Sequence, residues 1–271
     1  MSVTRPRPLV LGAVATDPKV VTVWDAFQRY FIQRGLPFEY VLYSNYEQQV
    51  RNHFDGQCHV ALNSPLAWIE VERLAVAHGR KASAIAMRDS DRDLHSVIVS
   101  RRDSDIAGIA DLKGRRVAVG AKDSPQATLV PLDLIAQAGL APGTDFEVIY
   151  LNACLGKHCA EVDDACETLM SGKVDACCLL DAHYSLFEQE TQIVATTEPF
   201  DNYNLTVLDG APQLQIERFV ALLLAMSPTD PQARALLDMA DVKQWLPGRL
   251  SGYVALHRAV DRFGPVSRTF R

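Results

Sequence analysis

Three times along this chain, an apolar run typical of a buried strand leads to Asp-Pro or Ser-Pro and then to the pattern of an amphipathic helix. The strand runs are residues 9–14, 59–62 and 117–120, and the dipeptides that follow them begin at Asp17, Ser64 and Ser124. An Asp or Ser at a helix N-cap accepts a hydrogen bond from a helix amide, and proline suits the first helical position because its missing N–H would have no partner there. The pattern therefore predicts an α/β fold in which helices begin at the carboxyl ends of strands.

This arrangement also indicates a kind of ligand. In open α/β sheets, ligands bind beyond the carboxyl ends of the strands. Helix N-termini placed there present free amides and the positive end of the helix dipole, which favour an anionic group. The alternative is that each dipeptide is only a good helix cap. Because the pattern recurs after strands, we expect a small anionic or strongly polar ligand.

Composition excludes several classes of partner. The 27 Lys and Arg residues against 33 Asp and Glu residues give a net charge of −6, so the chain has no general positive field for nucleic acid or an anionic membrane. No apolar run reaches the roughly 20 residues of a membrane span. The first residues lack the apolar core of a signal peptide, which predicts a cytoplasmic protein, or a periplasmic one if such a peptide has been removed. In a cytoplasmic protein the six cysteines are expected to be thiols.

The order of expected strands and helices suggests two lobes. Strand and helix patterns alternate up to about residue 100, a second strand–helix series begins near residue 116, and short strands return near residue 192. We expect a discontinuous first lobe of residues 1–97 and 194–271 and a second lobe of residues 98–193. Both lobes would be Rossmann-like with mostly parallel sheets, two crossover segments would join them, and the ligand would lie in the cleft between them.

Several stretches carry a resemblance to a known family. They are His95-Ser-Val-Ile-Val-Ser-Arg-Arg-Asp-Ser-Asp-Ile, Ala110-Asp-Leu-Lys-Gly-Arg-Arg-Val-Ala-Val-Gly, Leu129-Val-Pro131, Gly139-Leu-Ala-Pro142, Asp145-Phe-Glu-Val148, Ser171-Gly-Lys-Val-Asp-Ala176, Tyr43-Ser-Asn-Tyr46 and Ala61-Leu-Asn-Ser-Pro65. With this layout the chain resembles the type II periplasmic binding proteins, most closely the phosphonate-binding, PhnD-like branch of ABC-transporter solute receptors. The resemblance implies that the chain binds a polar or anionic solute, works with an ABC-transporter permease and needs no cofactor.

The strand ends and the resemblance together give a set of expected ligand contacts. In the first lobe and at the hinge they are Thr16, Asp17, Tyr43, Tyr46, Asn63, Ser64 and His95. In the second lobe they are Ser124, Gln126, His158 and Asp181. The family holds phosphonate with a Ser-Thr-Ser-Gly loop, where this chain has Ser124-Pro-Gln-Ala127. Proline removes one backbone donor and Gln126 replaces a hydroxyl by an amide, which argues against a tight phosphonate site.

The segment Cys154-Leu-Gly-Lys-His-Cys159 leaves an enzymatic alternative open. A helix N-terminus and Lys157 would favour a reactive thiolate at Cys159, with His158 able to transfer protons. Cytoplasmic enzymes of similar fold, such as the chorismate dehydratase of menaquinone synthesis and the pyrimidine synthase of thiamine synthesis, suggest a lyase or a cofactor-biosynthesis activity. Cys154, His158 and Cys159 could also hold a soft metal, but their spacing is not that of a zinc site, and we expect no metal.

Overall fold

The computed structural model describes residues 7–151 and 165–264, which form two α/β units. Unit 1 comprises described residues 7–92 and 201–251, and unit 2 comprises 93–151, 165–200 and 252–264. No helix in these ranges is both long and apolar enough to cross a membrane. The α/β class and the division into two sheets agree with the sequence prediction.

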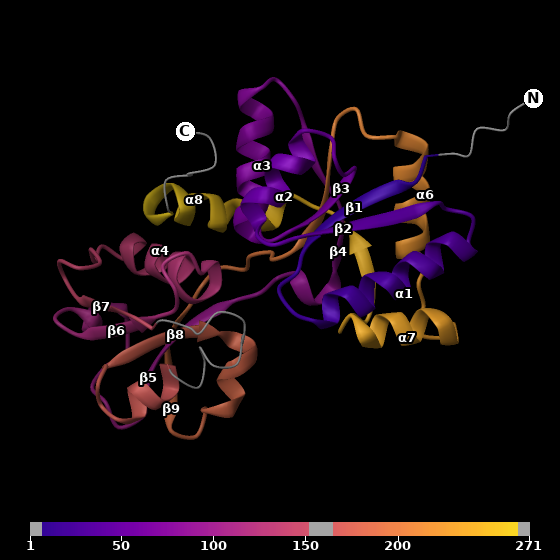
Figure 1. The fold of residues 1–271 in the computed structure, drawn as a ribbon. Coiled ribbons are helices and arrows are strands. Elements are labelled where there is room, and N and C mark those ends of the chain that lie inside the picture. Colours follow the sequence, from indigo (N-terminus) through magenta and orange to yellow (C-terminus); the bar gives the residue numbers. More distant parts are fainter. Residues whose placement is uncertain (1–6, 152–164, 265–271) are drawn as a thin grey trace, which may run out of the picture. The chain divides into compact units, whose positions relative to one another are not determined.

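Unit 1 is a six-stranded sheet covered by helices on both faces (Figure 1). Its strands are β1 (Leu9–Val14), β2 (Phe38–Tyr43), β3 (Val60–Asn63), β4 (Ala82–Arg88), β10 (Asn204–Leu208) and β11 (Trp245–Pro247). Its helices are α1 (Lys19–Gln33), α2 (Tyr46–Phe54), α3 (Pro65–Ala77), α6 (Gln213–Leu224) and α7 (Pro231–Met239). Helices α1, α6 and α7 cover one face of the sheet, and α2 and α3 cover the other.

Aromatic side chains build the α1 face of unit 1. Helix α1 places Trp24, Phe27 and Phe31 on its buried stripe, three and four residues apart, as an amphipathic helix requires. The ring of Phe31 lies 4.8 Å from that of Phe38 on β2 and 5.1 Å from that of Phe219 on α6, measured between centroids. Each pair adds about 1 kcal/mol to the burial of its apolar area. The core thus joins segments almost 200 residues apart in the sequence.

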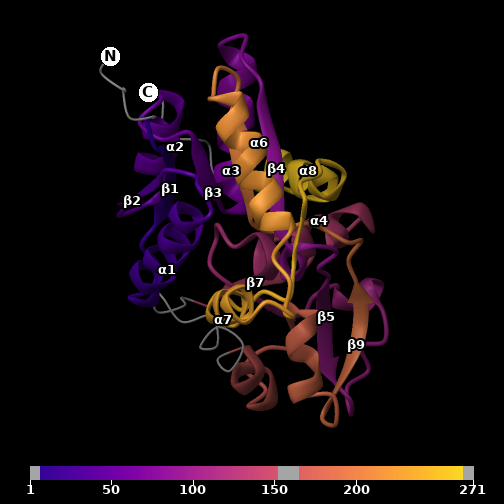
Figure 2. The ribbon, with the colours of Figure 1, turned by 90° about the vertical axis from the view of Figure 1, so that its right-hand side faces the viewer.

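Unit 2 is a five-stranded sheet, again between helices. Its strands are β5 (Ser96–Arg101), β6 (Arg116–Val119), β7 (Glu147–Tyr150), β8 (Ala176–Leu180) and β9 (Thr191–Thr196). Its helices are α4 (Val130–Gln137), residues 165–170 and α8 (Val254–Phe263). Helices α4 and α8 lie side by side in two perpendicular views (Figures 1 and 2) and pack against the core face that contains Ile98 and Val117. The helix at 165–170 packs on the opposite face with Val99 and Leu179.

The two sheets share one strand order. It is β2-β1-β3-β10-β4 in unit 1, with β11 added outside β4, and β7-β6-β8-β5-β9 in unit 2. In both, one strand runs against its two neighbours: β10 is antiparallel to β3 and β4, and β5 is antiparallel to β8 and β9. The sheets are therefore mixed, which corrects the expectation of mostly parallel sheets. The strand–helix alternation predicts where strands lie in the sequence. It contains no signal for the direction of a strand that enters a sheet from the other unit.

The division of the chain also differs from the predicted lobes. The predicted boundaries lie at residues 97/98 and 193/194, whereas the chain divides into its compact units at 92/93 and 200/201. A third crossing, at 251/252, carries α8 into unit 2, so the described chain passes between the units three times rather than twice. Helix α8 belongs there because Arg258 and Arg262 form ion pairs of 2.7 Å with Asp133 of α4, a carboxylate that is 1% exposed. Periodicity shows that a helix is amphipathic but not which sheet it covers.

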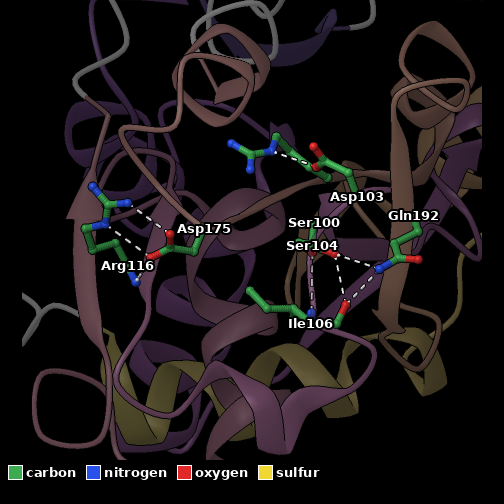
Figure 3. Close-up of polar contacts among 8 residues, drawn as sticks. Ser100, Asp103, Ser104, Ile106, Arg116, Asp175 and Gln192 are labelled. Atoms are coloured by element: carbon green, nitrogen blue, oxygen red, sulfur yellow. Dashed lines mark hydrogen bonds and ion pairs between the residues drawn. The ribbon is translucent and has the colours of Figure 1, made fainter.

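Two sets of polar contacts lie at the edge of the unit 2 sheet where β6 begins (Figure 3). Arg116 donates to Asp175 from its backbone N and from its guanidinium, at 2.8–3.1 Å, and this pairing lowers the pKa of the Asp175 carboxyl. Nearby, Gln192 donates to the Ile106 carbonyl at 2.9 Å, and the Ser100 hydroxyl donates to the same oxygen at 3.1 Å. The two sets of hydrogen bonds are separate, and each joins neighbouring segments at this edge.

The attachment of α8 gives a first prediction. Asp133→Ala removes the buried carboxylate that joins Arg258 and Arg262 of α8 to α4, and Arg258 keeps only its pair with Glu198. We therefore expect the free energy of unfolding to fall by about 3 kcal/mol in urea denaturation. Asp238→Ala is the matched control, because its pair with Arg234 is 3.8 Å long and well exposed and should contribute at most about 0.5 kcal/mol. Equal effects of the two variants would show that α8 is not held by Asp133.

A buried histidine in unit 1 gives a second prediction. His53 of α2 is 2% exposed, and burial lowers its pKa from 6.5 to about 4, with the charge of Arg80 acting in the same direction. The folded state therefore binds fewer protons than the unfolded chain between these two values. The contribution of neutral His53 to stability is fully present above about pH 6.5 and is lost as the pH falls. The free energy of unfolding should decrease by about 2 kcal/mol between about pH 7.5 and about pH 5.

Urea titrations at several pH values measure this loss. His53→Leu should reduce this loss, because leucine cannot take up the proton. An unaltered pH dependence in the His53 variant would assign the effect to other groups.

Candidate functional site

The strand directions bring the predicted contacts of unit 2 to one edge of its sheet. Strands β6, β8 and β9 end there, and the reversed strand β5 begins there, since Ser96 pairs with Leu180 and Val97 with Thr196. Residues just beyond these ends are His95, Gly120, Ser124, Gln126 and Asp181. This edge of unit 2 is called the β5/β8 edge below.

Ser124 begins a helix there, as the sequence predicts. Its hydroxyl accepts a hydrogen bond of 3.3 Å from the Ala127 amide, and Pro125 occupies the first helical position. The first turn, Pro125–Leu129, is a π turn that continues directly into α4. Gly120 allows this turn to approach the end of β6: a Cβ on Gly120 would lie 2.7 Å from the Cβ of Ala127.

Backbone and side-chain hydrogen bonds join the other members of the β5/β8 edge. The Ser96 hydroxyl donates to the Gln126 carbonyl at 2.5 Å, and the Asp181 amide donates to the His95 carbonyl at 3.0 Å. The ring of His95 lies 2.8 Å, through Nδ1, from the Thr197 carbonyl. Because a carbonyl oxygen only accepts, Nδ1 carries the proton of this hydrogen bond, which fixes the orientation of the ring. The structure thus brings His95, Gln126 and Asp181 together.

The corresponding edge of unit 1 gathers a second polar group. Ser64 caps α3, accepting a hydrogen bond of 3.4 Å from the Ala67 amide, and its hydroxyl also interacts with the phenol of Tyr46. The Tyr46 hydroxyl donates to the hydroxyl of Tyr203 at 3.1 Å. Burial, first of all, raises the pKa of Tyr46, so its phenol stays protonated and able to donate. Of these residues, Ser64 and Tyr46 were predicted as ligand contacts.

Sequence reasoning missed two members of this unit 1 group. Tyr203 precedes β10, and Arg88 ends β4 with its guanidinium carbon 5.3 Å from the centre of the Tyr203 ring. Asp91, 1% exposed, holds Arg88 by two hydrogen bonds, the longer being 2.8 Å. Arg88 could have been predicted as a ligand contact, because it is a basic residue at the end of a strand. Tyr203 had no such signal, because it reaches this edge only through the reversed direction of β10.

The remaining predicted contacts of unit 1 are placed differently. Thr16 and Asp17 are exposed, and Asp17 accepts a hydrogen bond of 2.7 Å from the Lys19 amide. The N-cap of α1 is Pro18 rather than the predicted Asp17, and its side chain makes no capping hydrogen bond. Tyr43 is half-buried, and its phenol interacts with the thiol of Cys58, each group being kept protonated by a raised pKa.

Asn63 lies inside unit 1 rather than at its surface. It is 0% exposed, accepts a hydrogen bond of 2.8 Å from Gln49 and donates one of 2.9 Å to Thr206. The Thr206 hydroxyl donates in turn to Asn204. This chain of buried polar side chains links α2, β3 and β10. The amide of Asn63 therefore serves the fold.

The cluster formed by Cys154, Lys157, His158 and Cys159 lies outside the described residues. Within 7–151 and 165–264, no group of three or more His, Cys, Asp or Glu side chains is arranged to hold a metal ion. The site residues that the structure does place are hydroxyls, amides, an imidazole, an arginine and a carboxylate, which suit the binding of a polar solute.

The fold is that of an α/β protein with two units of the same strand order. The profile of the family described as "ABC transporter, phosphonate, periplasmic substrate-binding protein" matches residues 13–253. The chain therefore belongs to this family, as its motifs predicted. The family is periplasmic, and the comparisons give no support to the cytoplasmic prediction or to the enzymatic alternative.

Solved structures show the same fold. PhnD1 from Prochlorococcus marinus in complex with methylphosphonate is 17% identical, with a TM-score of 0.68, over 97% of this chain and 100% of that one. XAC2383 from Xanthomonas citri bound to ATP is 18% identical, with a TM-score of 0.72, over 94% and 97%. The aliphatic sulphonate binding protein SsuA from Escherichia coli is 19% identical, with a TM-score of 0.51, over 98% and 81%. A comparison with the curated proteins returned no match.

The close approach at Gly120 gives a third prediction. In Gly120→Ala the added methyl group meets Ala127 and pushes the π turn away from β6, so we expect a loss of about 1–3 kcal/mol of stability. Gly108→Ala, in the same unit, adds its methyl group to open space at a φ of −154° and should be nearly neutral. Urea denaturation compares the two variants, and equal stabilities would show that the turn relaxes freely.

Proposed function

We propose that this chain is the solute receptor of an ABC transporter and that it binds a small solute with an oxyanion group, such as a phosphonate. Its membership of the phosphonate-binding family carries this proposal. The family's description also supports a periplasmic location and a permease as the partner that accepts the solute.

The β5/β8 edge of unit 2 has the chemistry that an oxyanion needs. A helix N-terminus carries a partial positive charge, and small anions bind at such ends without a full countercharge. Ser124 begins this helix, the half-exposed Gln126 follows in its first turn, and His95 lies beside them with its ring held by Thr197. A net charge of −6 makes such a local site necessary, since the chain as a whole repels anions.

Unit 1 supports the same proposal with donors of another kind. The phenols of Tyr46 and Tyr203 and the guanidinium of Arg88 form one group, which Asp91 orients. The O–H group of a phenol and the N–H groups of a guanidinium donate hydrogen bonds to oxyanions. Pro125 supplies no amide to the turn of unit 2, so the solute need not be methylphosphonate itself.

A panel of ligands tests the proposal and gives a fourth prediction. Methylphosphonate, ethanesulphonate and ATP are each added to the full chain, with glucose as a neutral comparison, and the melting temperature is followed. An oxyanion present at about 100 times its dissociation constant should raise the melting temperature by roughly 5 °C. Binding of glucose alone would contradict the proposal, as would the absence of any shift with all three anions.

A matched pair of variants locates the effect. Gln126→Glu keeps the size of the side chain but adds a negative charge at the helix N-terminus, so the shift caused by the anion should disappear. Gln189→Glu adds the same charge at an exposed position before β9, at the other edge of the sheet, and should retain the shift. An undiminished shift in the Gln126 variant would place the ligand away from the β5/β8 edge.

A further inference from the structure

The three described cysteines of unit 2 fall on two different faces of its sheet. Cys177 and Cys178 are neighbours on β8, so their side chains point in opposite directions. Cys178 packs among Ile98, Val117 and the residues of α4. Cys177 packs on the opposite face with Cys166, which belongs to the helix at 165–170. Strand alternation therefore pairs Cys166 with Cys177 and separates both from Cys178.

Cys166 and Cys177 are not merely in the same layer. Their thiols are hydrogen-bonded to each other, and both residues are at most 2% exposed. This hydrogen bond, together with burial, raises the pKa of Cys177. Two thiols in mutual contact, on two elements that a short connection joins, have the arrangement from which a disulfide can be made.

The connection between the two cysteines is itself fixed. Residues 171–175 link the helix to β8, and Arg116 holds them by donating to the Gly172 carbonyl at 3.0 Å and to Asp175 (Figure 3). The backbone between the two cysteines is thus anchored before any covalent bond is present. Closing a ring here requires little movement of the chain.

We propose that Cys166 and Cys177 form a disulfide when this protein folds under oxidising conditions, tying the helix at 165–170 to the central part of the unit 2 sheet. The two thiols lose two protons and two electrons, one S–S bond forms, and the oxidant is itself a disulfide whose S–S bond breaks to give two thiols. A small disulfide such as oxidised glutathione or a thiol–disulfide oxidoreductase supplies that bond. The family is described as periplasmic, and disulfide bonds persist in the periplasm.

Burial determines when this bond can form. The thiolate is the species that attacks a disulfide, and the folded protein keeps Cys177 protonated and away from solvent. The disulfide therefore forms while the chain is folding, before the helix covers β8. For the same reason, reduced protein that is already folded should oxidise slowly, and oxidised protein should resist reducing agents until it unfolds.

Peptide mapping tests the proposal on the full chain and gives the fifth prediction. The protein is unfolded and reduced, refolded in a mixture of reduced and oxidised glutathione, alkylated in urea so that buried thiols also react, and digested without reductant. Cleavage after Glu161, Glu167 and Lys173 separates Cys159, Cys166 and Cys177 into different peptides. We expect Cys166 linked to the peptide that contains Cys177 and Cys178, and a melting temperature that reductant lowers by roughly 5 °C.

Three single variants assign the bond. Cys166→Ala and Cys177→Ala should abolish both the linked peptide and the effect of reductant, whereas Cys178→Ala, one residue away on the other face, should keep both. Alkylation of Cys166 and Cys177 in the refolded wild-type protein would overturn the proposal, as would linkage of Cys166 to Cys154 or Cys159. No ligand is present in this experiment, so its outcome is independent of the proposed solute binding.

Discussion

The constraint on which the rest of this structure depends is the direction of one strand in each sheet. Strands β5 and β10 run against both of their neighbours, and each carries hydrogen bonds to two strands at once. The first residues of a reversed strand therefore lie where its neighbours end. This direction brings His95 beside Gln126 and Asp181 in unit 2, and Tyr203 beside Tyr46 in unit 1. Both polar groups consist of residues distant in the sequence because the sheets are mixed.

The two groups differ in how they carry positive potential. In unit 2 it comes from the amides of a helix N-terminus and from an imidazole whose Nδ1 is fixed. In unit 1 it comes from a full charge on Arg88, which a buried carboxylate partly neutralises and holds in place. A charge without a partner would interact more strongly with an anion but would also move more freely. Pairing with Asp91 therefore weakens the attraction of Arg88 for an anion and fixes the position of its guanidinium.

Local sequence patterns predicted the elements well and their associations poorly. The strand, cap and proline pattern correctly gave the starts of α3 at Ser64 and of the helical segment at Ser124, because capping depends on neighbours in the sequence. The burial of Asn63 and the place of Tyr203 were not predicted, because both depend on strand order and direction, which no local pattern encodes. The place of α8 followed from the buried carboxylate of Asp133, and a sequence does not show which acidic residue will be buried. Family membership, by contrast, was read correctly from short motifs spread over the chain.

The return of the chain into unit 2 has a consequence for biosynthesis. Helix α8 covers α4 and supplies both arginine partners of Asp133, yet its residues, 254–263, are translated long after the unit 2 sheet. Until they emerge from the ribosome, one apolar face is uncovered and one interior carboxylate lacks its counter-ions. Completion of unit 2 is therefore postponed, and the nascent polypeptide stays open for longer.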